Sequence, residues 1–289
     1  MALATGLLFG SVTPAQALVP YVYVPPQPLL EGTALASMTL AIRLLRLGQT
    51  EEAARLAELT VQLQPDDARS WLLLAETQRQ QNLAKAIDAL QQAKRLDPAN
   101  PDIWFTEGSL ALRNGKPAEA LQLLRRGLEL DGRNSGAYFD LGNANLLLGD
   151  SRAALIAFQR ASDLRGDFWE AINNQGLVLY EDGRIAEAIQ RWRRVLKIKP
   201  DVAETSLALA AALYAQAGER RSEAFQLAER ALAEDPNYVH DAFQKEQLWG
   251  PKLRAITTRL LQEPDLKAAV ERATANADGP SQEGAEEEP

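Results

Sequence analysis

A pattern of small and apolar residues recurs about every 34 residues between residues 34 and 236, and this repeat constrains the fold more than any other feature. Two neighbouring units show it in the same four places: Gly142, Gly149, Ala154 and Phe158, then Gly176, Gly183, Ala188 and Trp192. Proline or glycine closes each unit, at Pro65, Pro98, Gly132, Gly166, Pro200 and Pro236. A period of this length is typical of solenoids, whose units pack only against their neighbours. The sequence therefore predicts one elongated array of six units.

The repeated residues have a physical role in pairs of helices. A glycine inside a helix, such as Gly142 or Gly176, costs about 1 kcal/mol relative to alanine. That cost is offset only where two helices approach closely, and Phe158 and Trp192 then fill the space between units. Glycines such as Gly149 suit the turn that joins the two helices of a unit. These features predict an all-α fold.

The pattern resembles the tetratricopeptide repeat, and the resemblance covers residues 34–236. It implies a right-handed superhelical solenoid of six helix hairpins. Helical spacing without the period continues over residues 237–276, which we interpret as capping helices over the open end of the last pair. Trp249 as an exposed anchor for a partner is the alternative interpretation.

The N-terminal 17 residues predict a secretory signal peptide. An apolar run is followed by Pro14 and by the triplet Ala15-Gln16-Ala17, which is typical of a cleavage site before Leu18. No lysine or arginine precedes the run, so an apolar segment that stays on the protein as an anchor is the alternative. With cleavage, the protein is expected outside the cytoplasm, in a periplasm or thylakoid lumen. Without it, we expect a cytoplasmic or membrane-associated protein.

Two further segments flank the repeats. Residues 18–33 are rich in proline and tyrosine, and the four prolines between Pro20 and Pro28 predict an extended segment. Residues 277–289 predict an acidic disordered tail, because they hold no apolar residue that can build a core.

Composition argues against an enzyme. The chain has no cysteine and one histidine, His240, so a thiolate–imidazole metal site and a cysteine nucleophile are excluded. No catalytic residue, metal site or cofactor is predicted. The net charge of −8 argues against nucleic acid as a partner.

The resemblance also implies a binding groove. In such solenoids the first helix of each unit lines the concave face, through positions 2, 5, 9 and 12, with position 6 near by. These positions hold many apolar and aromatic residues together with amides, which predicts a groove for a peptide segment of a protein partner. The predicted groove residues are Leu72, Arg79, Phe105, Leu112, Phe139, Asn143, Leu146, Asn173, Asn174, Tyr180 and Tyr214.

Asn143 and Asn174 match two asparagines that help to hold a peptide's terminal carboxylate in chaperone-binding tetratricopeptide domains. Three cations accompany those asparagines, whereas this chain has Phe139, Glu204 and Ala208 at the matching places. Without charge-assisted bonds a carboxylate is held poorly. The amides instead suit a peptide backbone, and amides bonded to neighbouring helices or to water are the alternative.

The predicted function is that of a non-enzymatic scaffold or assembly factor. Segments such as "AQALVPYVYVPP" and "QLWGPKL" resemble tetratricopeptide proteins of cyanobacteria and plastids, which implies a place in photosynthetic complex assembly. One alternative is a structural module that self-associates. Another is a membrane-peripheral adaptor that uses the basic segment 191–199, although a solvated convex face explains those bases more simply. The sequence leaves the oligomeric state open.

Overall fold

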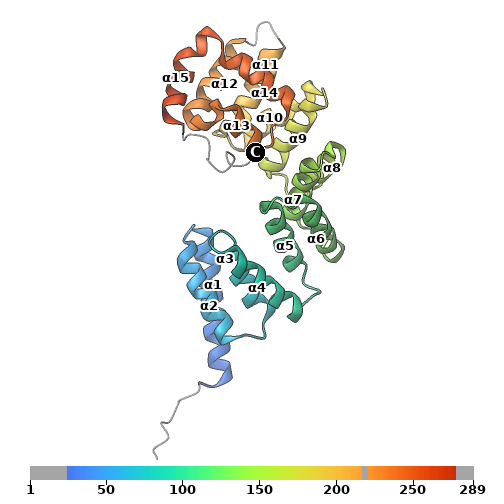
Figure 1. The fold of residues 1–289 in the computed structure, drawn as a ribbon, viewed down its shortest axis with the longest axis vertical. Helices are drawn as coiled ribbons and strands as arrows, with labels where there is room; N and C mark the ends of the chain where they lie inside the picture. Colours follow the sequence, from blue (N-terminus) through green and yellow to red (C-terminus); the bar gives the residue numbers. More distant parts are fainter. Residues whose placement is uncertain (1–24, 217–220, 278–289) are drawn as a thin grey trace, which may run out of the picture.

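The computed structural model describes residues 25–216 and 221–277, and within these ranges the chain is all-α. Six antiparallel helix pairs follow one another, as the repeat predicts (Figure 1). The pairs are α1 (Gln27–Arg46) with α2 (Thr50–Leu63), α3 (Ala68–Gln78) with α4 (Leu83–Leu96), α5 (Pro101–Arg113) with α6 (Pro117–Leu130), α7 (Ser135–Leu147) with α8 (Ser151–Leu164), α9 (Trp169–Glu181) with α10 (Ile185–Ile198), and α11 (Ala203–Ala215) with α12 (Arg221–Glu234). We call them units one to six.

The pairs stack along a curved path, from α1 at the bottom of Figure 1 to α12 at the top. In three pairs of neighbouring units the odd-numbered helices are in contact: α1 with α3, α5 with α7, and α9 with α11. Each even-numbered helix from α2 to α10 packs against the odd-numbered helix that follows it. The odd-numbered helices therefore form the inner layer of the solenoid and the even-numbered helices the outer layer.

Two glycines show why the repeat needs small residues. A Cβ atom added at Gly176 would lie 2.4 Å from Nε1 of Trp192, which is fully buried. One added at Gly142 would lie 2.4 Å from Cε1 of Phe158. The close helix approach predicted from the sequence is therefore confirmed.

Replacing Gly176 with alanine is expected to lower the free energy of unfolding by about 1–3 kcal/mol, because the added methyl group overpacks the contact with Trp192. Urea denaturation measures the change. Gly166→Ala is the matched control, since nothing lies within 4 Å of a Cβ atom there, and it should change stability by less than about 0.5 kcal/mol. Equal effects of the two substitutions would contradict the close approach.

The first helix starts earlier than the sequence predicts. The extended segment was expected to reach residue 33, but α1 begins at Gln27. Pro26 is the N-cap residue and Pro28 lies in the first turn, where proline is tolerated because the helix needs no N–H donor there. The predicted signal peptide, residues 18–24 and residues 278–289 of the predicted tail lie outside the described residues.

The chain after α12 forms five short elements: η1 (Pro236–Val239), α13 (Asp241–Glu246), α14 (Pro251–Leu261), η2 (Pro264–Leu266) and α15 (Lys267–Asn276). η1 and α15 pack against α12, the last outer helix. In contrast, α14 contacts α9 and α11, which belong to the inner layer. The chain thus covers both the end of the solenoid and part of its inner face.

Candidate functional site

The chain's own C-terminal segment, residues 241–261, fills the inner face of units five and six. Trp249 is 3% exposed, and its indole Nε1 donates to Oε1 of Glu204 at 3.0 Å. Leu253 is fully buried, and it shares a core cluster with Leu177 and Leu207 of the inner helices. Trp249 is therefore an internal anchor, and the alternative that it is exposed for a partner is wrong.

The start of α14 is fixed by a carboxylate from α9. Glu181 accepts the backbone N–H groups of Lys252 at 3.2 Å and of Leu253 at 2.9 Å. These N–H groups lie in the first turn of α14, where a helix has no internal acceptors for them. A negative charge is also favoured there by the helix dipole. The interaction joins the C-terminal segment to the end of unit five.

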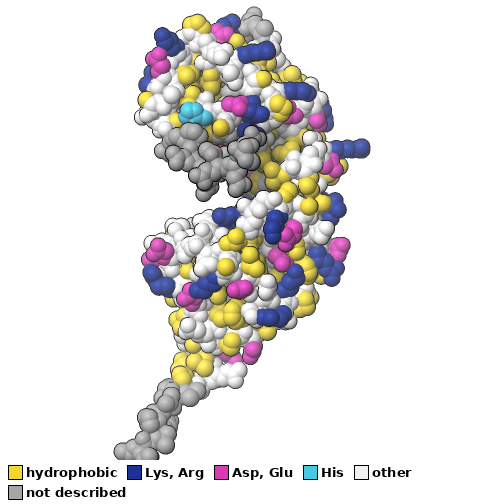
Figure 2. Space-filling model, in the orientation of Figure 1, with side chains coloured by type: hydrophobic (Ala, Val, Ile, Leu, Met, Phe, Trp, Pro, Cys, Tyr) yellow, Lys and Arg dark blue, Asp and Glu magenta, His cyan; other side chains and the backbone are white. Residues whose placement is uncertain are grey.

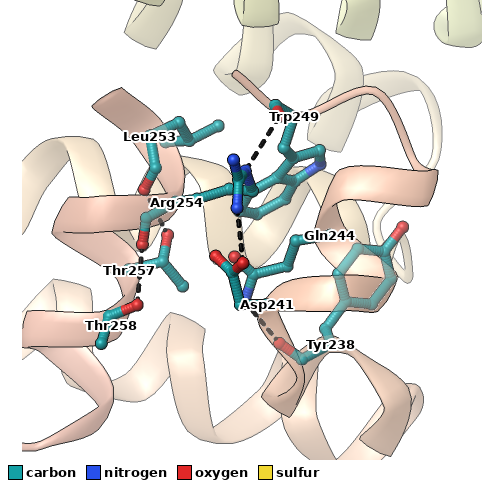
Figure 3. A network of polar contacts seen from close by, with 8 residues as sticks. All are labelled: Tyr238, Asp241, Gln244, Trp249, Leu253, Arg254, Thr257 and Thr258. Atoms are coloured by element: carbon teal, nitrogen blue, oxygen red, sulfur yellow. Dashed lines mark hydrogen bonds and ion pairs between the residues drawn. The ribbon is translucent and has the colours of Figure 1, made fainter. Parts of the chain in front are cut away.

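The turn between α13 and α14 is braced by the contacts in Figure 3. The Arg254 guanidinium donates to the Trp249 carbonyl at 3.2 Å and to the Asp241 carboxylate. The amide of Gln244 donates to the Tyr238 carbonyl at 2.8 Å. Leu248 has φ +65°, a conformation that costs a leucine about 1–3 kcal/mol. This bracing and the burial of Trp249 hold the turn in place.

Glu204 is the most perturbed carboxyl group of the site. Burial beneath the C-terminal segment raises its pKa to about 7, and hydrogen bonds from Trp249 and Asn173 offset only part of the shift. Near neutral pH, Glu204 therefore exists as a mixture of its protonated and ionised forms.

The asparagines bond to one another across three inner helices. The Asn174 amide donates to Oδ1 of Asn143 at 3.1 Å, and the Thr205 hydroxyl donates to Oδ1 of Asn173 at 2.8 Å. Asn173 is only 1% exposed. These contacts fit the alternative interpretation for Asn173, whose side chain is almost fully covered although it lines the same small pocket as Asn143 and Asn174.

Two aromatic residues of the predicted groove are also buried. The Phe105 ring fills the space left by Gly127, where an added Cβ atom would lie 2.5 Å from Cε1 of the ring. Tyr180 packs against Trp192 with ring centroids 6.0 Å apart, and burial raises the pKa of its hydroxyl. Their prediction as groove residues is wrong for the same reason: each completes the core between helices.

The other predicted groove residues remain partly exposed to solvent. Eight of them are half-buried on the inner helices or at their ends: Leu72, Arg79, Leu112, Phe139, Asn143, Leu146, Asn174 and Tyr214. Tyr214 differs from the rest, because its hydroxyl donates to Glu263 of the C-terminal region. Phe139, Asn143, Asn173 and Asn174 line a pocket of about 220 Å³, together with Leu248 of the C-terminal segment. The partly exposed groove residues thus concentrate in units two to four and at their border with unit five.

Polar and charged groups that the groove prediction omits lie among these residues. Glu76 accepts from the Thr106 hydroxyl at 2.8 Å, and Asp140 accepts from the Ser109 hydroxyl. The Arg79 guanidinium lies 3.8 Å from Glu76. Burial raises the pKa of Asp140. The groove in units two to four is therefore mixed, because these polar groups lie among the half-buried Leu72, Leu112 and Phe139. The sequence already indicated these polar groups, because Glu76 and Ser109 occupy inward positions of the repeat.

The basic segment 191–199 is largely engaged by the chain itself. Arg193 pairs with Glu223 at 3.2 Å, and Arg194 donates to the Gly166 carbonyl at 2.8 Å. The Lys199 ammonium lies 4.4 Å from the centre of the Trp169 ring. Bases and acids alternate over the face drawn in Figure 2. These contacts give the segment a structural role on the outer layer.

Comparison with known proteins agrees with this architecture. Tetratricopeptide-repeat family models match residues 38–101, 105–167 and 176–216. No curated protein matches the chain.

Several solved structures share the fold. MamA is 24% identical with a TM-score of 0.50, and the match covers 62% of this chain and 94% of MamA. PilW, described as a widely conserved type IV pilus biogenesis factor, is 18% identical with a TM-score of 0.57, over 78% of this chain and 98% of PilW. The Cut9–Hcn1 structure gives 18% identity and a TM-score of 0.66, over 82% of this chain and 46% of the matched chain. With its six helix pairs and matching family models, the chain belongs to the tetratricopeptide repeat family.

Proposed function

We propose that this protein is a non-enzymatic scaffold that holds a polypeptide segment against the inner face of units two to four. One observation carries the proposal: the C-terminal segment fills the inner face of units five and six, while Leu72, Arg79, Ser109 and Asn143 keep exposed surface. Tetratricopeptide domains are interaction modules, so the uncovered stretch is where a partner has room to bind.

The chemistry of this face indicates the kind of segment that it fits. Asn143, Asn174 and Ser109 carry groups that hydrogen-bond to a peptide backbone. In the cluster of Glu76, Arg79 and Asp140, two carboxyl groups lie beside one guanidinium, which favours a basic side chain in the partner. Leucine side chains from α3, α5 and α7 supply apolar contacts of about 1.5–3 kcal/mol each. After the cost of ordering the segment, we expect micromolar affinity.

Leu72→Asp combined with Asn143→Ala is expected to reduce partner recovery at least about tenfold in crosslinking and pulldown from the native compartment, because both an apolar contact and an amide contact are lost. Ile156→Asp is the control, since Ile156 is 63% exposed on the outer helix α8. Unchanged recovery by the inner-face variant would contradict the proposed binding face.

We further propose that the protein works outside the cytoplasm, in the assembly of photosynthetic complexes. The resemblance of its N-terminal and "QLWGPKL" segments to proteins of cyanobacteria and plastids supports this. N-terminal sequencing of the protein isolated from cells should find Leu18 as the first residue. An intact N-terminal segment would contradict export by cleavage and would favour the retained anchor.

A further inference from the structure

The pocket beside Asn143 and Asn174 has acidic walls. Its lining residues come from α7, α9 and α11, and from the end of α13 with the turn that follows. Three of them are acids, Glu170, Glu204 and Glu246, and none of the described lining residues is a lysine, arginine or histidine. The pocket therefore concentrates negative charge next to amide groups.

Two of these acids lack a cationic partner. In the described part of the chain, no lysine or arginine forms an ion pair with Glu204 or Glu246, and the polar partners of Glu204 are the neutral groups of Trp249 and Asn173. Glu170 has one weak partner, a guanidinium from the end of α8 at 4.0 Å. The negative charge of the pocket is therefore largely unbalanced.

Other acids of this region are paired within the chain. Glu263 lies 2.5 Å from the Arg221 guanidinium, and Asp241 lies 2.5 Å from that of Arg254. A carboxylate that is taken out of water is costly unless an opposite charge accompanies it. The unbalanced acids of the pocket therefore indicate a ligand that brings a positive charge.

The size and the walls of the pocket indicate which cation fits. Among the described residues, no group of three acids is arranged to hold a metal ion. The volume of about 220 Å³ is below the range of about 300–1,000 Å³ that is typical of sites for whole small molecules, so it suits the end of one side chain. The rings of Phe139 and Trp169 line the pocket. A guanidinium stacks on aromatic faces, and its five N–H donors bond to carboxylates and amide oxygens, so arginine matches this pocket better than lysine.

We propose that the pocket binds an arginine side chain of the polypeptide segment that lies on units two to four, with the guanidinium beside Glu204. This inference rests on the proposed function. Phe139 and Asn143 connect the two sites, because they line the pocket and also belong to the inner helix of unit four. Past the pocket, α14 covers the inner helices of units five and six, so the arginine binds where the path of the partner ends.

A small probe tests the pocket in the full-length protein without any partner. N-acetylarginine amide should shift the NMR signal of the Trp249 indole N–H, which bonds to Glu204, and the shift should saturate in the millimolar range. The titration is run at pH 8, where Glu204 is mostly ionised. N-acetylcitrulline amide has nearly the same shape without the charge and should bind at least about tenfold more weakly. Equal binding of the two probes would overturn the proposal.

Variants of the acids test the position of the guanidinium. Glu204→Gln should weaken binding of the arginine probe at least about tenfold, and Glu246→Gln, at an exposed position, about threefold with an unchanged melting temperature. Glu51→Gln is the matched control, because it removes the same charge from an exposed site on the outer helix α2. Unchanged binding by Glu204→Gln, or an equal loss in Glu51→Gln, would overturn the proposal.

Butylguanidinium separates a peptide side chain from a free organic cation. It has no backbone groups for Asn143 and Asn174 and should bind at least about threefold more weakly than N-acetylarginine amide. Equal binding would assign the pocket to a free cation instead.

The probe and the binding face can fail separately. If the probe does not bind while a partner still crosslinks from Ser109 on α5, only the pocket assignment is wrong. If the probe binds as expected while no partner crosslinks from Ser109, the pocket keeps its arginine specificity and the binding face on units two to four is wrong.

Discussion

Trp249→Ala is expected to lower the free energy of unfolding by about 3–5 kcal/mol, the range for truncating a large buried aromatic residue. The indole is 3% exposed, packs 5.7 Å from the Tyr238 ring centre and donates to Glu204. Its loss leaves a cavity and also leaves Glu204 without its indole donor. The turn at Leu248 then loses the main contact that offsets its unfavourable backbone conformation.

Urea denaturation gives the size of the effect, and hydrogen exchange locates it. Amides of α11 and α14 should exchange faster in Trp249→Ala, whereas those of α5 and α6 should keep their protection. Trp71→Ala is a matched control, because this half-exposed indole also donates one hydrogen bond, to the Pro65 carbonyl. If the two variants lose equal stability, Trp249 does not anchor the C-terminal segment.

Stability is expected to fall as the pH rises from about 4.5 to about 7, because of Glu204. Burial places its folded-state pKa at about 7, above the ordinary value of 4.5. In this window the folded state binds more protons than the unfolded state, so the favourable contribution is complete below the lower pKa and is lost through the upper one. The change amounts to about 3–4 kcal/mol at most.

Glu204→Gln should remove most of this pH dependence, since the amide keeps an acceptor for Trp249 and carries no charge. The variant should be more stable than the wild type at pH 8 and similar at pH 5, as measured by urea denaturation. The pKa of Asp140 is also raised by burial, and Asp140→Asn separates its contribution. A wild-type pH profile that matches that of Glu204→Gln would contradict the burial of an ionisable Glu204.

The fold was predictable because each unit repeats the same helix pair, with small residues at the same positions of helix contact. The positions of Gly142 and Gly176 predict close helix approach, and the structure shows their partners Phe158 and Trp192 there. The course of the chain after residue 241 was not predictable from the period, because no repeat register continues there. One signal was available: α11, "AETSLALAAALYA", is apolar on all sides, and such a helix is covered all round.

The same limit explains the errors in the predicted groove. Inward position in a repeat identifies which side of a helix a residue occupies, but not whether another element covers that side. Asn173 is at an inward position, but it accepts a hydrogen bond from Thr205 of the neighbouring inner helix and is only 1% exposed. Phe105 points inward, and its ring turns onto Gly127 because this glycine leaves room for it. The small residue at position 127 was visible in the sequence, while the burial of Asn173 depended on tertiary packing.

The central claim is that a partner binds the inner face of units two to four. The most direct measurement is photo-crosslinking in cells from a photoreactive amino acid at Ser109, on the inner helix α5, compared with one at Gln122, which is exposed on the outer helix α6. We predict a specific partner adduct from position 109 that position 122 does not give. The same adduct in equal yield from both positions, or an adduct from position 122 alone, would contradict the claim.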